Sequence, residues 1–295
     1  MVLTISRQSH VSPPHNPHKK TKSDMNIVKI HGSIAEQMFQ YAFYLALTRH
    51  TPDSFLDTPA AWLDKRFRLP RFRIATPQQL QHFGKGSLKN RLLASVKRPQ
   101  GDTLIEPDNH FHSHYLTLDN TYFCGSWLAP AYFAQVADDI ADCFFVPTKA
   151  LPASASHSLS LLAKGETVAV HVHNPLDKAN PCTPDYYNWA IANVLSYISR
   201  PTFIVMTTDI NWAREHLNFQ GAKADFMVYP AEKEISMLPY LSRTSHNILS
   251  ATLTSWWAAW LNRNPDKIVL APDQWSKTAS YPDLYPSSWT TIPTT

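Results

Sequence analysis

The chain contains little glycine, with 7 glycines among 295 residues, whereas about 7% is the usual share. Loops that bind nucleotide phosphates use glycine where the backbone must come close to the phosphate. This chain therefore has few residues available for a glycine-rich phosphate loop.

Paired cysteines and long apolar runs are also absent. The three cysteines, Cys124, Cys143 and Cys182, have neither paired nor metal-ligand spacing, which indicates free thiols in a reducing compartment. No apolar run approaches the roughly 20 residues of a membrane-spanning helix, and the N-terminus has no apolar segment of signal-peptide length. We expect a cytoplasmic protein, and peripheral contact with a membrane stays open.

Charge excess is small as well. The net charge is +4, from 27 basic and 23 acidic residues. Most of it lies in the first 24 residues, which hold Arg7, Lys19, Lys20 and Lys22 against Asp24. The remainder is close to neutral and lacks the basic stripe of a nucleic-acid-binding protein. With 44% hydrophobic residues, the chain is typical of a globular protein of one large or two modest domains.

The order of expected elements predicts two α/β domains. Residues 1–24 are expected to be a disordered tail rich in basic, proline and histidine residues, and Met25 is a candidate native start. Residues 25–150 form the first expected domain. It has strands at 26–31, 55–57 and 120–125 and helices at 35–49 and 132–143.

A linker over 147–165 precedes clear strand–helix alternation. The expected strands cover 167–173, 202–208, 225–229, 247–250 and 267–270, and the expected helices cover 184–198, 210–217, 234–242 and 254–262. This alternation predicts a parallel, doubly wound sheet over residues 165–275. The C-terminal tail, 276–295, is rich in Pro, Ser and Thr. The possibility that it crosses back over the first domain stays open.

Several segments together carry a resemblance to one enzyme family. They are Gln37–Ala42 (Gln-Met-Phe-Gln-Tyr-Ala), 125–133, 185–191, 207–212, 246–248, Ser255–Trp260 (Ser-Trp-Trp-Ala-Ala-Trp) and 264–268. In order and spacing they resemble the inverting α-1,2-fucosyltransferases, which move fucose from GDP-fucose onto a sugar hydroxyl. The resemblance covers the chain from Met25 to about Trp275.

The resemblance implies a GT-B-like architecture of two Rossmann-like lobes with the site in the cleft between them. The first lobe would face a glycan acceptor, and the second would hold the nucleotide-sugar donor. Neither a metal nor a further cofactor is expected.

The first departure from the family lies at its Gly-Gly-Leu-Gly-Asn-Gln loop, which is Gly32-Ser33-Ile34-Ala35-Glu36-Gln37 here. Two of the three glycines are absent, and Glu36 replaces an amide. A carboxylate that points at a diphosphate would repel it, unless it turns to solvent. Gly32, Ser33 and Gln37 remain the expected donor-binding residues of this loop.

The second departure lies at the family's His-x-Arg-Arg-x-Asp motif, which is His171-Val172-His173-Asn174-Pro175-Leu176 here, with Asp177 one place late. Both arginines are missing, although their planar forks suit phosphate oxygens. Loss of one such donor costs on the order of 10²–10³ in rate. Replacement cations would have to be Lys178, Lys233 or Arg243.

The roles implied for this segment each have an alternative. His171 and Asn174 would bind the donor, and His173 would supply a partial positive charge near pH 6.5. Asp177 would act as general base, or it is an ordinary surface carboxylate. His171 and His173 share one face of a strand, but a third metal ligand at clear spacing is absent, so His171 is interpreted as structural.

Three further donor-binding candidates lie at helix starts. Asp209 would recognise ribose or base, and Thr252 and Ser255 would face the phosphates. Asp209 could instead cap its helix, and Ser255 or Thr254 could cap the helix over 254–262. At least two of Trp256, Trp257 and Trp260 are predicted to be core residues.

Two hypotheses follow. The chain is a fucosyltransferase-like enzyme, or it is a degenerate relative that kept the scaffold and binds a glycan, a nucleotide or a protein partner. A Lys or Arg in the cleft near Ser33 and His173 would favour the enzyme.

Overall fold

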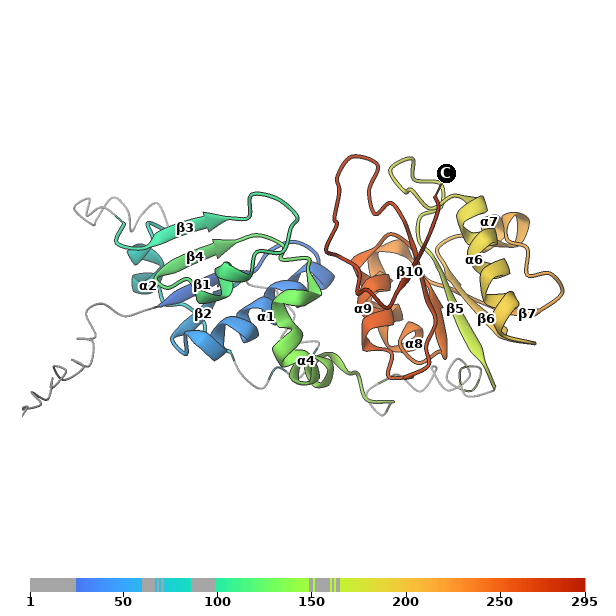
Figure 1. The fold of residues 1–295 in the computed structure, drawn as a ribbon, viewed down its shortest axis with the longest axis horizontal. Helices are drawn as coiled ribbons and strands as arrows, with labels where there is room; N and C mark the ends of the chain where they lie inside the picture. The colour runs from blue at the N-terminus through green and yellow to red at the C-terminus, as the bar shows by residue number, and fades with distance from the viewer. Residues whose placement is uncertain are drawn as a thin grey trace, which may run out of the picture.

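The computed structural model describes residues 25–59, 67, 69, 72–85, 99–148, 151, 160, 162 and 165–294. The tail predicted for residues 1–24 lies outside this range. The described chain forms two lobes, each built on a parallel sheet (Figure 1). The predicted fold class, two α/β lobes of the GT-B kind, is confirmed.

The first lobe contains a four-stranded sheet in the order β2-β1-β4-β3. Its elements are β1 (Asn26–Lys29), α1 (Ile34–His50), β2 (Ser54–Asp57), α2 (Pro77–His82), β3 (Asp102–Ile105), the 3-10 helix η2 (Ser113–Thr117), β4 (Thr121–Cys124), the 3-10 helix η3 (Pro130–Val136) and α4 (Ala137–Phe144). All its strand pairs are parallel.

The second lobe contains a six-stranded parallel sheet in the order β10-β9-β8-β5-β6-β7. Its elements are β5 (Thr167–Val172), α6 (Pro184–Tyr197), β6 (Thr202–Thr207), α7 (Ile210–His216), β7 (Lys223–Val228), the 3-10 helix η6 (Ala231–Met237), α8 (Leu238–Leu241), β8 (His246–Ile248), α9 (Leu253–Leu261), β9 (Val269–Pro272) and β10 (Thr290–Ile292).

Two predicted helices are broken in the structure. The helix expected over 234–242 is η6 followed by the short α8, with Lys233 in a non-helical conformation and a proline in the first turn of α8. The proline has no N–H for the helical ladder, so a continuous helix cannot run through it. The helix expected over 132–143 divides into η3 and α4 after Val136, and Phe133 inside η3 is also non-helical.

The C-terminal segment contacts both lobes. The amide of Asn109 donates to the Ser280 carbonyl, and the Phe111 N–H donates to the Asp283 carboxylate. The chain then returns to the second sheet, where β10 pairs with β9.

The lobes are joined through α1 and α9. The ring of Phe39 lies 4.6 Å from the rings of both Trp256 and Trp257, and the Trp257 indole N–H donates to the Ala35 carbonyl at 3.0 Å. Trp256 and Trp257 are fully buried, which confirms that at least two of the three tryptophans are core residues. Two of the segments that carry the family resemblance, Gln37–Ala42 and Ser255–Trp260, therefore lie where the lobes meet. No described helix is long and apolar enough to cross a membrane.

Candidate functional site

Two pockets lie beside the start of α9. In open parallel sheets, ligands bind beyond the carboxyl ends of the strands, where the strand order reverses. In the second sheet this reversal lies at β5, between β6 and β8. The segments that follow β5 and β8 both contribute to the pockets.

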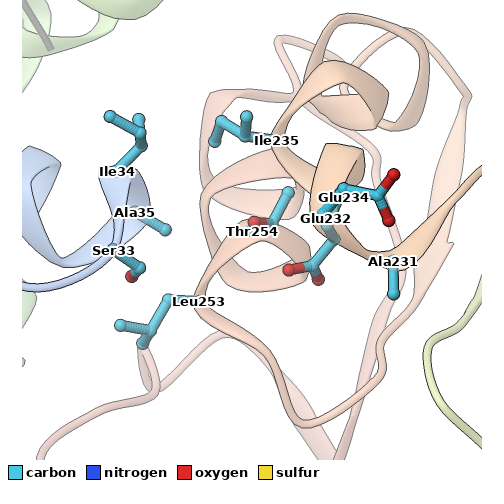
Figure 2. Close-up of a pocket in the computed structure, with 9 residues that line it drawn as sticks. All are labelled: Ser33, Ile34, Ala35, Ala231, Glu232, Glu234, Ile235, Leu253 and Thr254. Carbon is cyan, nitrogen blue, oxygen red and sulfur yellow. The ribbon is translucent and has the colours of Figure 1, made fainter.

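The first pocket, here the inter-lobe pocket, has a volume of about 370 Å³. The first lobe contributes the start of α1, and the second lobe contributes η6 and the start of α9. Its lining residues are Ser33, Ile34, Ala35, Ala231, Glu232, Glu234, Ile235, Leu253 and Thr254 (Figure 2). In Figure 2 the Glu232 carboxylate points into the space facing α1, whereas the Glu234 carboxylate turns away from α1.

The second pocket, here the strand-end pocket, has a volume of about 260 Å³. Its lining residues are His173, Asn174, Asp177, Ala179, Asn180, Pro181, Ser250, Ala251, Thr252, Trp275 and Ser276. Thr252 lines this pocket and the next two residues line the other, so the first turn of α9 separates the two.

The backbone of the loop before α1 donates a hydrogen bond to the carboxylate of Glu36, in the first turn of α1. Ser33 is the N-cap of α1, and its side chain accepts from the Glu36 N–H, while the Glu36 carboxylate accepts from the Ser33 N–H at 2.7 Å. The Glu36 carboxylate therefore turns back onto its own loop, where it closes a capping box. The Ser33-Ile-Ala-Glu36 spacing is the sequence signal that predicts this arrangement.

Gly32 and Gln37 are also engaged within this loop. Gly32 has a φ of +76°, which favours glycine, and a Cβ there would displace the Glu36 carboxylate, whose nearest oxygen lies 2.2 Å away. Its carbonyl accepts from the buried Gln37 amide at 3.0 Å. Of the three loop residues predicted to bind a donor, only Ser33 lines a described pocket.

The capping alternative is confirmed for Asp209, whereas the prediction that Ser255 or Thr254 caps α9 is wrong. The Asp209 carboxylate caps α7, and the Thr252 hydroxyl caps α9 by accepting from the Ser255 N–H. The Ser255 hydroxyl accepts from the Ser250 N–H at 3.0 Å. Of Asp209, Thr252 and Ser255, only Thr252 lines a described pocket.

His171 in β5 and His173 just after it share a tyrosine. The Tyr229 hydroxyl lies 2.5 Å from His171 Nε2 and 3.0 Å from His173 Nδ1. Burial, followed by the proximity of His173, lowers the pKa of His171 to about 3, so its imidazole is neutral. His171 is 1% exposed, which agrees with the structural interpretation, whereas His173 opens onto the strand-end pocket.

A carboxylate completes this cluster. Glu234 Oε1 lies 3.9 Å from both His171 Nε2 and His173 Nδ1. Glu234 thus lies beside the two histidines, although it has no clear sequence spacing to them. Glu234 is distant along the chain and reaches β5 only through the fold, so no local spacing could reveal it.

The described residues that line the two pockets include no Lys or Arg. Arg243 instead donates to the carbonyls of Pro239 and Val146, away from both pockets. Lys178 and Lys233 are exposed, and neither lines a described pocket. None of the three proposed replacement cations takes the place of the missing arginines.

Asp177 is an exposed residue of the strand-end pocket. Its carboxylate accepts from the Ala179 N–H at 2.9 Å and stabilises the turn. Asn174 has a positive φ of 41°, and its N–H donates to the Thr208 hydroxyl. Both line the strand-end pocket and also shape its wall.

A family comparison agrees with this architecture. The chain matches the model of glycosyl transferase family 11 over residues 3–293. The two-lobed fold and the inter-lobe pocket thus belong to a glycosyltransferase scaffold, and the chain is a member of glycosyl transferase family 11.

Individual relatives cover less of the chain. The Escherichia coli O-antigen biosynthesis glycosyltransferase WbnK is 32% identical over 107 residues, which are 36% of this chain and 35% of that protein. An Escherichia coli alpha-1,2-colitosyltransferase is 23% identical over 163 residues, 52% of this chain and 55% of that protein. The matches thus span from a third to about half of these relatives' lengths.

A solved structure shows the same fold. A mutant of Arabidopsis thaliana FUT1 in complex with GDP superposes with a TM-score of 0.52 at 11% identity, over 92% of this chain and 77% of that chain.

Proposed function

We propose that the chain transfers fucose from GDP-fucose to a glycan hydroxyl, with inversion at the anomeric carbon. The observation that carries the proposal is the pair of adjacent pockets at the carboxyl edge of the second sheet, one of them lined by both lobes. Together they provide space of the size typical for small-molecule sites, about 300–1,000 Å³.

The first turn of α9 is the proposed seat of the diphosphate. The first N–H groups of a helix have no partners within the helix and favour anions. The Thr252 side chain accepts from the Ser255 N–H within this turn. The Glu232 carboxylate faces the inter-lobe pocket, so we place GDP in the strand-end pocket and the sugar and its acceptor in the inter-lobe pocket.

The proposed chemistry is a direct displacement. The acceptor oxygen attacks the anomeric carbon as the bond from that carbon to the phosphate oxygen breaks, and GDP leaves with the bonding electrons. A carboxylate takes the hydroxyl proton. The geometry favours Glu232, because it lines the pocket between the lobes. Asp177 lines the strand-end pocket, and its carboxylate accepts a hydrogen bond within a turn.

A second candidate function is ligand binding without transfer. It is favoured by the absence of Lys and Arg among the described pocket residues and by the Glu36 carboxylate, which already occupies the Ser33 N–H. A binding protein needs no stabilisation of a departing diphosphate, so the missing cations would cost it less than they cost a transferase.

A donor-hydrolysis assay with GDP-fucose separates the two functions. The transferase hypothesis predicts GDP release, lowered about 10² or more by Glu232→Gln if this carboxylate acts as base. Asp185→Asn, an exposed carboxylate change on α6, is the matched control and should leave the rate unchanged. GDP binding without any release would establish the binding function instead.

A further inference from the structure

The geometry points to a site for one divalent transition-metal ion of the Zn²⁺ class, held by His171, His173 and Glu234. One nitrogen of each imidazole and one carboxylate oxygen lie within 4.8 Å of one another. No residue of this cluster belongs to a recognised metal motif of the sequence, because the two histidines and the glutamate are brought together only by the fold.

The distances are close to those of a metal-bound set. Both imidazole nitrogens lie 3.9 Å from Glu234 Oε1. In a tetrahedral zinc site with bonds of about 2.0–2.1 Å, neighbouring ligand atoms are roughly 3.3–3.5 Å apart. Contraction of the two separations from Glu234 by about half an ångström would give the spacing of ligands on one ion.

The donor types suit the same class of ion. Two imidazoles and one carboxylate form a common set for zinc and for other first-row transition metals, whereas Mg²⁺ and Ca²⁺ prefer oxygen ligands alone. The Tyr229 hydroxyl lies 2.5 Å and 3.0 Å from the two imidazole nitrogens, within reach of the same point. Because these distances are shorter than those between ligands of one ion, the hydroxyl would have to move outward as the ion binds.

The buried atoms of the cluster have unmet bonding capacity. Glu234 Oε1 is inaccessible to solvent and has no hydrogen-bond donor among the described residues. A charged oxygen enclosed without a donor is costly unless a cation accompanies it. A metal ion at this point would satisfy the carboxylate oxygen that also lies nearest to both imidazoles.

An ion could reach this point from the pockets. Glu234 lines the inter-lobe pocket, and His173 lines the strand-end pocket. The ion would place positive charge beside pockets whose described walls include no Lys or Arg. Charge compensation of a bound diphosphate by this ion rests on the proposed function, but the metal site itself does not.

The test is calorimetric titration of Zn²⁺ into the full chain after treatment with a chelator and its removal. The histidines at 10, 15 and 18 are replaced by alanine in every protein, so that they do not bind the ion. We expect one Zn²⁺ per chain and loss of at least tenfold in affinity with Glu234→Gln. Glu232→Gln, a carboxylate two residues away, should bind Zn²⁺ as the parent does.

Melting temperature and a second variant test the metal site without reference to transferase activity and show that each variant is folded. Saturating Zn²⁺ should raise the melting temperature of the parent and of Glu232→Gln, but not that of Glu234→Gln. His173→Ala should repeat the Glu234→Gln result. Absence of binding, or equal binding by parent and Glu234→Gln, would overturn the site. Zinc binding with no GDP binding would leave the site intact and overturn the proposed function.

Discussion

At the scale of single residues, most polar positions expected to face a donor instead hold the backbone. Asp209 and Thr252 cap helices, and the Ser255 hydroxyl accepts from the Ser250 N–H. Such roles need only a short polar side chain at a helix start. These side chains therefore have structural roles that do not depend on a bound ligand.

Glu36 places a negative charge at the start of α1, in the loop that the family resemblance assigns to the donor. Glu36→Gln keeps a capping-box residue type while it removes a negative charge from the start of α1. We expect the affinity for GDP to rise about fivefold, which corresponds to about 1 kcal/mol at a helix terminus. Calorimetry measures this change, and Glu215→Gln on the exposed face of α7 is the charge-matched control. Equal affinity of Glu36→Gln and the parent would show that this carboxylate does not act on the ligand.

Ser255 is predicted to contribute to stability rather than to binding. Ser255→Ala leaves the buried Ser250 N–H without its acceptor, which should cost about 1–3 kcal/mol of unfolding free energy. Urea denaturation gives this value. A variant as stable as the parent but with weakened GDP binding would assign the hydroxyl to the ligand.

At the scale of elements, α1 and α9 form the contact between the lobes. The indole of Trp257 donates to Ala35 of α1 and packs on Phe39. Trp257→Phe should therefore destabilise the protein by about 1–3 kcal/mol, because it removes both a buried hydrogen bond and part of the packing. Trp189→Phe, at a tryptophan that is 47% exposed, should change stability by less than about 0.5 kcal/mol. Similar losses in both variants would contradict the role of Trp257.

The regular elements could be predicted because their signals are local. The apolar run of α1 and the strand–helix alternation after residue 166 depend on periodicity alone. The three-residue strand β10 carries no such pattern and forms only by pairing with β9. The local pattern likewise identified His171 and His173 at the end of β5. It could not identify Glu234, because the contact of Glu234 with these histidines depends on how η6 packs against the sheet.

At the scale of the whole molecule, one continuous apolar core runs through both lobes. It includes Phe39 of α1, Trp256 of α9 and Ile204 of the second sheet. We therefore expect the lobes to unfold together, in a single calorimetric transition. Two separate transitions, one for each lobe, would contradict this shared core.

The missing positive charge can be restored by substitution. The double change His173→Arg and Asn174→Arg places two guanidinium groups in the strand-end pocket and should raise GDP affinity at least tenfold in chelator-treated buffer. Gln135→Arg with Asn211→Arg, both exposed and outside the described pockets, adds the same charge as a control. If both double variants raise the affinity for GDP equally, the increase comes from net charge and not from the position of the guanidinium groups.

The central claim, that the strand-end pocket binds a nucleoside diphosphate, is tested most directly by calorimetric titration with GDP. Three proteins are compared: the parent, Ala179→Trp, which fills the pocket from an exposed position, and Ala134→Trp, an exposed alanine outside the described pockets. The account predicts one GDP per chain, at least tenfold weaker binding by Ala179→Trp and unchanged binding by Ala134→Trp. No binding at millimolar GDP, or binding that Ala179→Trp leaves unchanged, would contradict it.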